Sequence, residues 1–199
     1  MARTRKRLHL DSVKRICADA EKNSELESID FDSLKKLNSG STSIVFEHPR
    51  YPTMVLGFTT DKAKIDWFKE NRKKLNFELI QTEMVESIYD EIHKYLYCFK
   101  MKKLEALSPV ESAYVQKEIL SKYSKMDFHP IFKGFAPNMR VLSIAKQTAD
   151  KKFKSMLFKL KNFLEKNSVE MELLKSSFLK TPQGDIIMID PVYSTKERI

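Results

Sequence analysis

The chain has 199 residues, of which 42% are hydrophobic, and it contains only four glycines and seven prolines. This composition is typical of a chain with a packed core and excludes low-complexity and disordered classes. Lysine and arginine total 36 against 27 acidic residues, and the resulting net charge of +9 favours anionic partners such as nucleic acid or an acidic protein surface. No apolar stretch is long enough for a membrane-spanning helix, so we expect no membrane contact. The two cysteines, Cys17 and Cys98, lie far apart and fit a reducing compartment such as the cytoplasm.

Residues 1–30 predict a basic arm and a first helix. The arm carries four basic side chains within its first seven positions, Arg3, Arg5, Lys6 and Arg7. Asp11 is a suitable N-cap for the helix, whose apolar positions recur every three or four residues.

Residues 31–107 predict a sheet with one helix. A turn of small residues at 38–43 precedes two apolar runs, at 44–46 and 54–58, which predict a β-hairpin. A helix that begins at Thr60 or Asp61 carries Ile65, Trp67 and Phe68 into the core. Two further strands are predicted at 87–92 and 95–101, the second from its alternation of aromatic side chains.

Residues 108–199 predict a mainly helical region that ends in a hairpin. Ser108, Pro109 and Glu111 form the signature of a capping box with proline at the first helical position, and we expect this helix to reach about Tyr123. A loop follows at 128–138, and then a long helix from Val141 or Thr148 to Lys166. A turn at 181–185 separates two apolar runs, the second of which ends at Asp190-Pro191. Strands first and helices second indicate an α+β fold.

This order of elements is similar to the protein-kinase fold, in which a sheet lobe with one helix leads through a hinge to a helical lobe and a hairpin that carries a metal-binding aspartate. Four stretches resemble the early serine/threonine protein kinases of small podoviral bacteriophages. They are 37–49 as the phosphate loop, 51–58 as the third strand, 85–107 as the strand pair and hinge, and 183–194 as the closing hairpin. The resemblance implies a shortened two-lobe kinase-like domain that acts in the cytoplasm of a bacterial host cell.

The resemblance also assigns site residues. Ser39, Gly40 and Ser41 stand in the phosphate loop, and Asp190 stands in the place of the metal-binding aspartate. Glu172 takes the position of the catalytic aspartate. Ser177, five residues later, takes the position of the metal-binding asparagine.

The departures from a working kinase are as informative as the matches. Glu172 and Ser177 are not the residues that a kinase uses. The position at which the third strand needs a phosphate-holding lysine falls on or near Gly57, and this strand contains no lysine. Phosphoryl transfer depends on positioning and charge compensation, so each such loss removes about 10²- to 10³-fold in rate. The sequence therefore leaves enzymatic activity open.

Three functions remain after this comparison. The first is a pseudokinase that binds a host bacterial protein, inhibits or redirects it, and needs no cofactor. The second is a divergent kinase that uses ATP and Mg²⁺, with Asp190 on the metal, Glu172 as base, and Lys35 or Lys36 on the phosphates. The third is a nucleic-acid-binding protein that uses the basic arm, Arg3, Arg5, Lys6 and Arg7.

Overall fold

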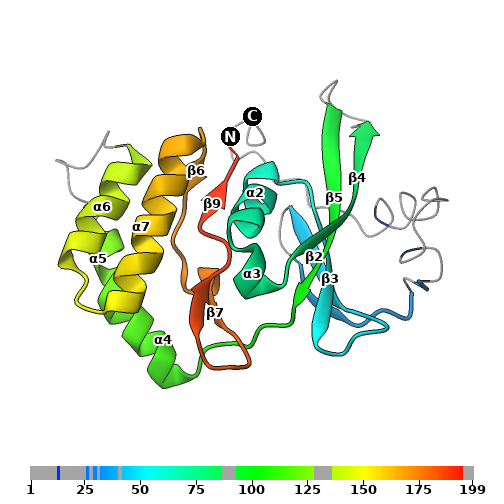
Figure 1. The fold of residues 1–199 in the computed structure, drawn as a ribbon, viewed down its shortest axis with the longest axis horizontal. Coiled ribbons are helices and arrows are strands. Elements are labelled where there is room, and N and C mark those ends of the chain that lie inside the picture. Colours follow the sequence, from blue (N-terminus) through cyan, green and yellow to red (C-terminus); the bar gives the residue numbers. More distant parts are fainter. Residues whose placement is uncertain are drawn as a thin grey trace, which may run out of the picture. The chain divides into compact units, whose positions relative to one another are not determined.

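The computed structural model describes residues 13, 26, 29–30, 32–39, 42–86, 93–127 and 136–194. The chain divides into two compact units, Met1–Lys103 and Leu104–Ile199. The first contains a five-stranded antiparallel sheet with helices, and the second contains helices and two small β-ribbons, which confirms the α+β class (Figure 1). Gly40, Ser41, the basic arm and the predicted strand at 87–92 lie outside the described residues. None of the described helices is long and apolar enough to cross a membrane.

The sheet of the first unit has the order β1-β2-β3-β5-β4. Its strands are β1 (Lys36–Ser39), β2 (Ser43–Glu47), β3 (Met54–Thr59), β4 (Glu78–Glu86) and β5 (His93–Lys102). Strands β2 and β3 pair with Ile44 opposite Phe58, which confirms the predicted hairpin, and β5 confirms the predicted strand at 95–101. Strands β1 and β4 were not predicted. They are the two edge strands, and their polar sequences lack the strong apolar alternation that marks a strand buried on one face.

Helix α2 (Lys62–Glu70) begins where the sequence predicts, at the N-cap Asp61, whose carboxylate accepts hydrogen bonds from the Ala63 and Lys64 amides. Its Trp67 and Phe68 are buried, as predicted. The short helix α3 (Arg72–Leu75) follows it. A hydrophobic cluster packs on the sheet, with members from β2, β3 and β5 and from the N-terminal region: Val13, Leu26, Ile44, Phe46, Leu56, Phe58, Leu96 and Cys98.

The second unit begins with a run of helix formed by α4 (Pro109–Val115), the π-helix η1 (Gln116–Leu120) and α5 (Ser121–Asp127). The predicted capping box is confirmed, because the Ser108 hydroxyl accepts from the Glu111 amide and the Glu111 carboxylate accepts from the Ser108 amide at 2.7 Å. The helical run ends at Asp127, beyond the predicted end at about Tyr123. Within the π-helix, the carbonyl of Glu118 accepts a hydrogen bond from the Thr148 hydroxyl at 3.2 Å, so the widened turn has a tertiary partner.

The helix predicted from Val141 or Thr148 to Lys166 begins near the second of these positions, and a separate helix precedes it. Helix α6 (Pro137–Gln147) ends at Thr148, whose extended backbone breaks the helix and whose hydroxyl donates back to the Ile144 carbonyl. Helix α7 (Lys151–Lys166) starts after a new N-cap, Asp150. The start at Val141 was wrong because the capping residues Thr148 and Asp150 lie inside a continuous apolar periodicity, whereas the start at Thr148 and the end at Lys166 are close to the observed bounds. The apolar stripe of α7 is buried almost as predicted, at Phe153, Leu157, Leu160, Phe163 and Leu164.

Two antiparallel ribbons close the second unit. Strands β7 (Phe178–Lys180) and β8 (Ile186–Met188) form the predicted hairpin, with Gly184 at a φ of +86° in its turn. Strand β6 (Glu170–Met171) pairs with β9 (Val192–Tyr193). The short 3₁₀-helix η3 (Lys175–Ser177) directly precedes β7.

Asp150 makes the stability of α7 sensitive to pH. The Phe153 amide donates to its carboxylate at 2.9 Å, and this bond is the main cause that lowers the pKa of Asp150, with the Tyr114 hydroxyl adding to it. A folded-state pKa below the unfolded value means that this stabilisation is present at neutral pH and is lost as the pH falls through the folded pKa.

The variant Asp150→Asn keeps a good N-cap and removes the charge. At pH 7 we expect it to be less stable than wild type by about 0.5 kcal/mol, and the difference should shrink as the pH falls below the unfolded pKa of about 3.9 and through the lower folded pKa. Urea unfolding curves measured across this range check the prediction. A difference that stays constant with pH would contradict it.

Candidate functional site

Backbone hydrogen bonds bring three sequence-predicted site residues into one region of the second unit. The Glu172 amide donates to the Pro191 carbonyl at 3.0 Å, and the Ile189 amide donates to the Ser177 carbonyl at 2.8 Å. Asp190 therefore lies between two residues whose backbones are bonded to the segment 172–177. The β6–β9 ribbon and the β7–β8 hairpin hold this arrangement from both sides.

The three side chains differ in their exposure to solvent. Asp190 is exposed and Glu172 is half-buried, whereas Ser177 is buried. The Ser177 hydroxyl accepts a hydrogen bond from the Leu174 amide at 3.2 Å and so belongs to the η3 turn. This role is structural, and it differs from that of an amide side chain directed at a metal.

A metal ion in this region would need carboxylate ligands. Mg²⁺ in phosphoryl-transfer sites is commonly held by one or two carboxylates together with substrate phosphates, and Asp190 and Glu172 are the carboxylates that this region offers. Within the described residues, no group of three or more His, Cys, Asp or Glu side chains is placed to hold a metal ion.

On the third strand, Gly57 faces an aromatic cluster. Gly57 lies opposite Val45 of β2 and Phe99 of β5 in the sheet. A Cβ atom built on Gly57 would lie 2.2 Å from Cζ of Phe99 and 2.5 Å from its Cε2, far inside van der Waals contact. The Phe99 ring is itself packed against Phe68 of α2 and Phe77, at centroid distances of 5.3 and 5.8 Å. The buried phenyl ring of Phe99 therefore fills the space that a lysine side chain at this position would need.

A lysine that the sequence analysis missed lies beside the turn of small residues. The Lys64 ammonium of α2 donates to the Ser43 hydroxyl at 2.9 Å, and Ser43 donates to the buried Thr59 hydroxyl at 2.8 Å. The signal that would have found it is its position three residues after the N-cap Asp61, in the first turn of a helix that follows the hairpin directly. Of the three predicted phosphate-loop site residues, Ser39, Gly40 and Ser41, the structure describes Ser39, which is exposed at the end of β1.

The two lysines expected to hold phosphates lie elsewhere on the hairpin. Lys35 forms an ion pair with Glu47 at 3.2 Å, and this pairing contributes to a lowered pKa of Glu47, after the larger effect of Lys103. Lys36 is exposed at the first position of β1, opposite Phe46. Both lie toward the end of the β1–β2 ladder away from the turn.

An anion already occupies the N-terminus of α2. Asp61 is 4% exposed, and its carboxylate accepts from the amides of Ala63 and Lys64 at 2.9 and 3.3 Å. Because these amides are the donors that a phosphate would use at a helix N-terminus, Asp61 competes with any phosphate for this end of the helix.

A scan against protein-family models and a search of curated proteins find no match for this chain.

The close packing over Gly57 predicts a large effect from a small substitution. Gly57→Ala should destabilise the protein by about 1–3 kcal/mol, because the Phe99 ring has to move while Phe68 and Phe77 hold it in place. Chemical denaturation gives the free energy of unfolding.

The double variant Gly57→Ala with Phe99→Leu tests the cause. Its destabilisation should be smaller than the sum for the two single variants, since the shorter side chain leaves room for the new methyl group. Strict additivity, or a Gly57→Ala variant as stable as wild type, contradicts the proposed packing.

Proposed function

We propose that this chain is a kinase-like scaffold that has lost phosphotransferase activity and binds a host bacterial protein, which it inhibits or redirects in the cytoplasm of the host cell. The observation that carries the proposal is the phenyl ring of Phe99 over Gly57. A kinase holds the α- and β-phosphates of ATP with a third-strand lysine, and this strand has no space for one on that face.

The kinase-like part of the proposal is supported by the order of elements. A sheet with a helix between its third and fourth strands is followed by helices, and a hairpin then leads to Asp190. This is the order on which the sequence resemblance rests. The hydrogen bonds that bring Glu172 and Ser177 next to the Asp190 segment agree with the roles that the resemblance assigns to these positions.

The loss of activity is supported by the chemistry at the same positions. The Ser177 hydroxyl is used within its own turn, and the Asp61 carboxylate occupies the amides at the start of α2. A phosphotransferase stabilises charge that develops on transferred oxygens, and it needs cations and donors directed at them. Each missing group costs about 10²- to 10³-fold in rate, and several are missing together.

Lys64 favours a second candidate function, a divergent serine/threonine kinase that uses ATP and Mg²⁺. Its ammonium lies beside the turn of small residues and can supply a cation that the third strand lacks. In this alternative, Asp190 holds the metal and Glu172 accepts the hydroxyl proton of the substrate.

Ligand-induced thermal shifts separate the two candidates. With ATP and Mg²⁺ at millimolar concentration, we expect no change in the melting temperature and no transfer of radiolabelled phosphate. A ligand present at 100 times its dissociation constant would stabilise the fold by about 2.7 kcal/mol and give a clear shift. A shift that disappears in both Asp190→Ala and Lys64→Met would instead establish the divergent kinase.

The partner is identified by affinity purification of the tagged chain from a bacterial lysate. We expect one host protein to be retained in a fixed ratio, and equally by Asp190→Ala, because this binding does not use the metal position. Purification of the same partner, followed by binding in the absence of nucleotide, completes the test. If every retained protein is lost on Asp190→Ala, the pseudokinase proposal fails.

A further inference from the structure

The outward face of helix α7 is rich in lysine. Its buried positions fall on one side, and its lysines lie on the opposite side and along the flanks, where Lys154, Lys159 and Lys161 are half-buried. This outward face carries six lysines against one acidic residue, Glu165: Lys151, Lys152, Lys154, Lys159, Lys161 and Lys166. We refer to these six residues as the α7 lysine face.

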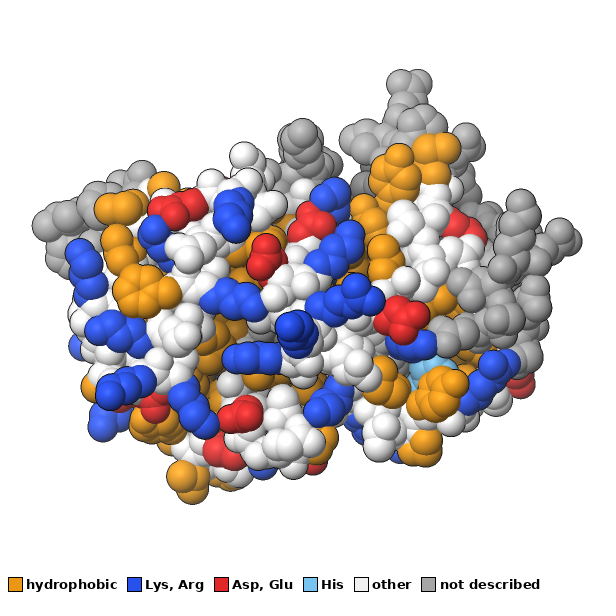
Figure 2. Space-filling view, viewed as in Figure 1, with side chains coloured by type: hydrophobic (Ala, Val, Ile, Leu, Met, Phe, Trp, Pro, Cys, Tyr) orange, Lys and Arg blue, Asp and Glu red, His pale blue; other side chains and the backbone are white. Residues whose placement is uncertain are grey.

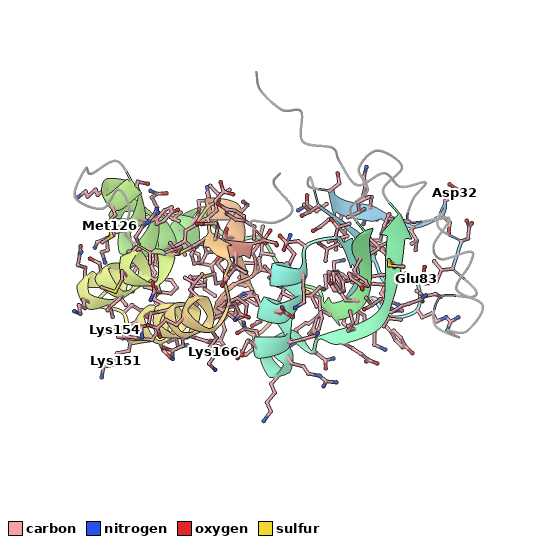
Figure 3. The ribbon with its side chains drawn as sticks, turned by 90° about the horizontal axis from the view of Figure 1, so that it is seen from above. Asp32, Glu83, Met126, Lys151, Lys154 and Lys166 are labelled. Carbon is pink, nitrogen blue, oxygen red and sulfur yellow. The ribbon has the colours of Figure 1, made fainter. Side chains whose placement is uncertain are left out.

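The lysines of this face differ in whether an acidic side chain pairs with them. Lys161 pairs with Glu165 at 2.7 Å, and Lys152 pairs with Asp185 at 3.1 Å. Among the residues that the structure describes, no acidic side chain forms an ion pair with Lys151, Lys154 or Lys166. Figure 3 shows these three side chains along one side of the helical unit, directed away from it.

The surface view agrees with this charge pattern. Lysine and arginine side chains outnumber acidic ones over α6 and α7 on the face that Figure 2 shows. Helix α6 adds Arg140 and Lys146 to the basic side chains of this helix pair. Glu165 is bound to Lys161 and to the Asn138 amide, and its pKa is lowered by these contacts, so it stays ionised but is locally paired.

Five of the six lysines form two rows, and Lys151 lies on the ridge between them. At about 100° per residue, Lys154 and Lys161 lie on one flank of the helix, and Lys152, Lys159 and Lys166 lie on the other. Ser155, Phe158 and Asn162 form the ridge between the rows, and all three are exposed. A helix of this length is roughly 24 Å long and about 10–12 Å across, which suits the major groove of B-form DNA, about 12 Å wide with phosphates along both sides.

We propose that the α7 lysine face binds double-stranded DNA, with its two rows directed at the phosphates on either side of the major groove and its ridge directed at the base edges. Lysine ammonium groups suit phosphates as point charges, and such contacts give affinity without sequence preference. A-form RNA is a poorer fit, because its major groove is narrow and deep.

An acidic protein surface fits this face less well. The cores of protein–protein interfaces are depleted in lysine and centred on clustered aromatic anchors. The ridge has one aromatic residue, Phe158, which is only 37% exposed. The proposed DNA binding uses neither ATP nor the Asp190 region nor the N-terminal arm, so it stands independently of the proposed pseudokinase function.

Fluorescence anisotropy with a labelled 20-base-pair DNA duplex tests the proposal in the full-length chain. Affinity measured between about 50 and 200 mM salt gives the slope of log K against log salt, which is close to −0.9 for each phosphate neutralised. In the variant Lys151→Gln/Lys154→Gln/Lys166→Gln, the slope should become shallower by about 2, because Lys154 and Lys166 lie in the rows directed at phosphates, and affinity should fall at every salt concentration.

A matched control removes the same charge from the first unit. The variant Lys69→Gln/Lys73→Gln/Lys74→Gln changes three exposed lysines of α2 and α3. Its slope should stay within about one unit of wild type. Circular dichroism and urea unfolding establish that both variants are folded.

Three kinds of outcome overturn the proposal. The first is no duplex binding by wild type at low salt. The second is an equal loss in both triple variants, which indicates a general effect of net charge, or no loss in the α7 variant, which assigns any binding to another part of the chain. The third is tight binding of a polyglutamate peptide that is abolished by Phe158→Ala, which assigns the face to an acidic protein.

Discussion

The packing of Phe99 against Gly57 and Phe68 joins the sheet of the first unit to its main helix. A glycine on the central strand β3 lets the ring lie directly on the backbone, and Phe68 and Phe77 then hold it there. Aromatic contacts of this kind add to the stability of a core beyond the area that they bury. The same packing fills the space that a lysine side chain at position 57 would need. This position can therefore accommodate the Phe99 ring or a lysine, but not both.

Backbone hydrogen bonds hold together the segments around Asp190 in the second unit, whereas the Ser177 side chain there is used within its own turn. Two ribbons and two cross-connecting hydrogen bonds place Glu172 and Ser177 beside the Asp190 segment. The buried Ser177 hydroxyl stabilises a turn instead of a metal. Backbone bonds of this kind do not depend on side-chain identity, so substitutions at these positions can change the chemistry of the region without changing its backbone arrangement.

Helix α7 carries part of the excess of basic residues on one of its faces. One side of the helix forms the core of the second unit through Leu157 and Leu160, and the opposite side carries the α7 lysine face. The excess of positive charge on this face costs stability through like-charge repulsion, even though Lys152 and Lys161 each pair with an acidic side chain. A polyanion that neutralises it removes this cost and gains from counterion release.

The sequence alone determined the features that are encoded within a few residues: the β2–β3 and β7–β8 hairpins, the start of α2 at Asp61, and the capping box at Ser108. Each depends on turn residues or on a side chain bonded to a neighbouring backbone group, so no distant residue needs to be known. Only the tertiary structure decided that Phe99 covers Gly57, that Lys64 reaches Ser43, and that Thr148 ends α6. The first two contacts join residues far apart in the chain. In the third, a C-cap at Thr148 ends the helix although the apolar periodicity continues past it. Their outcome depends on packing that forms only when the whole unit folds.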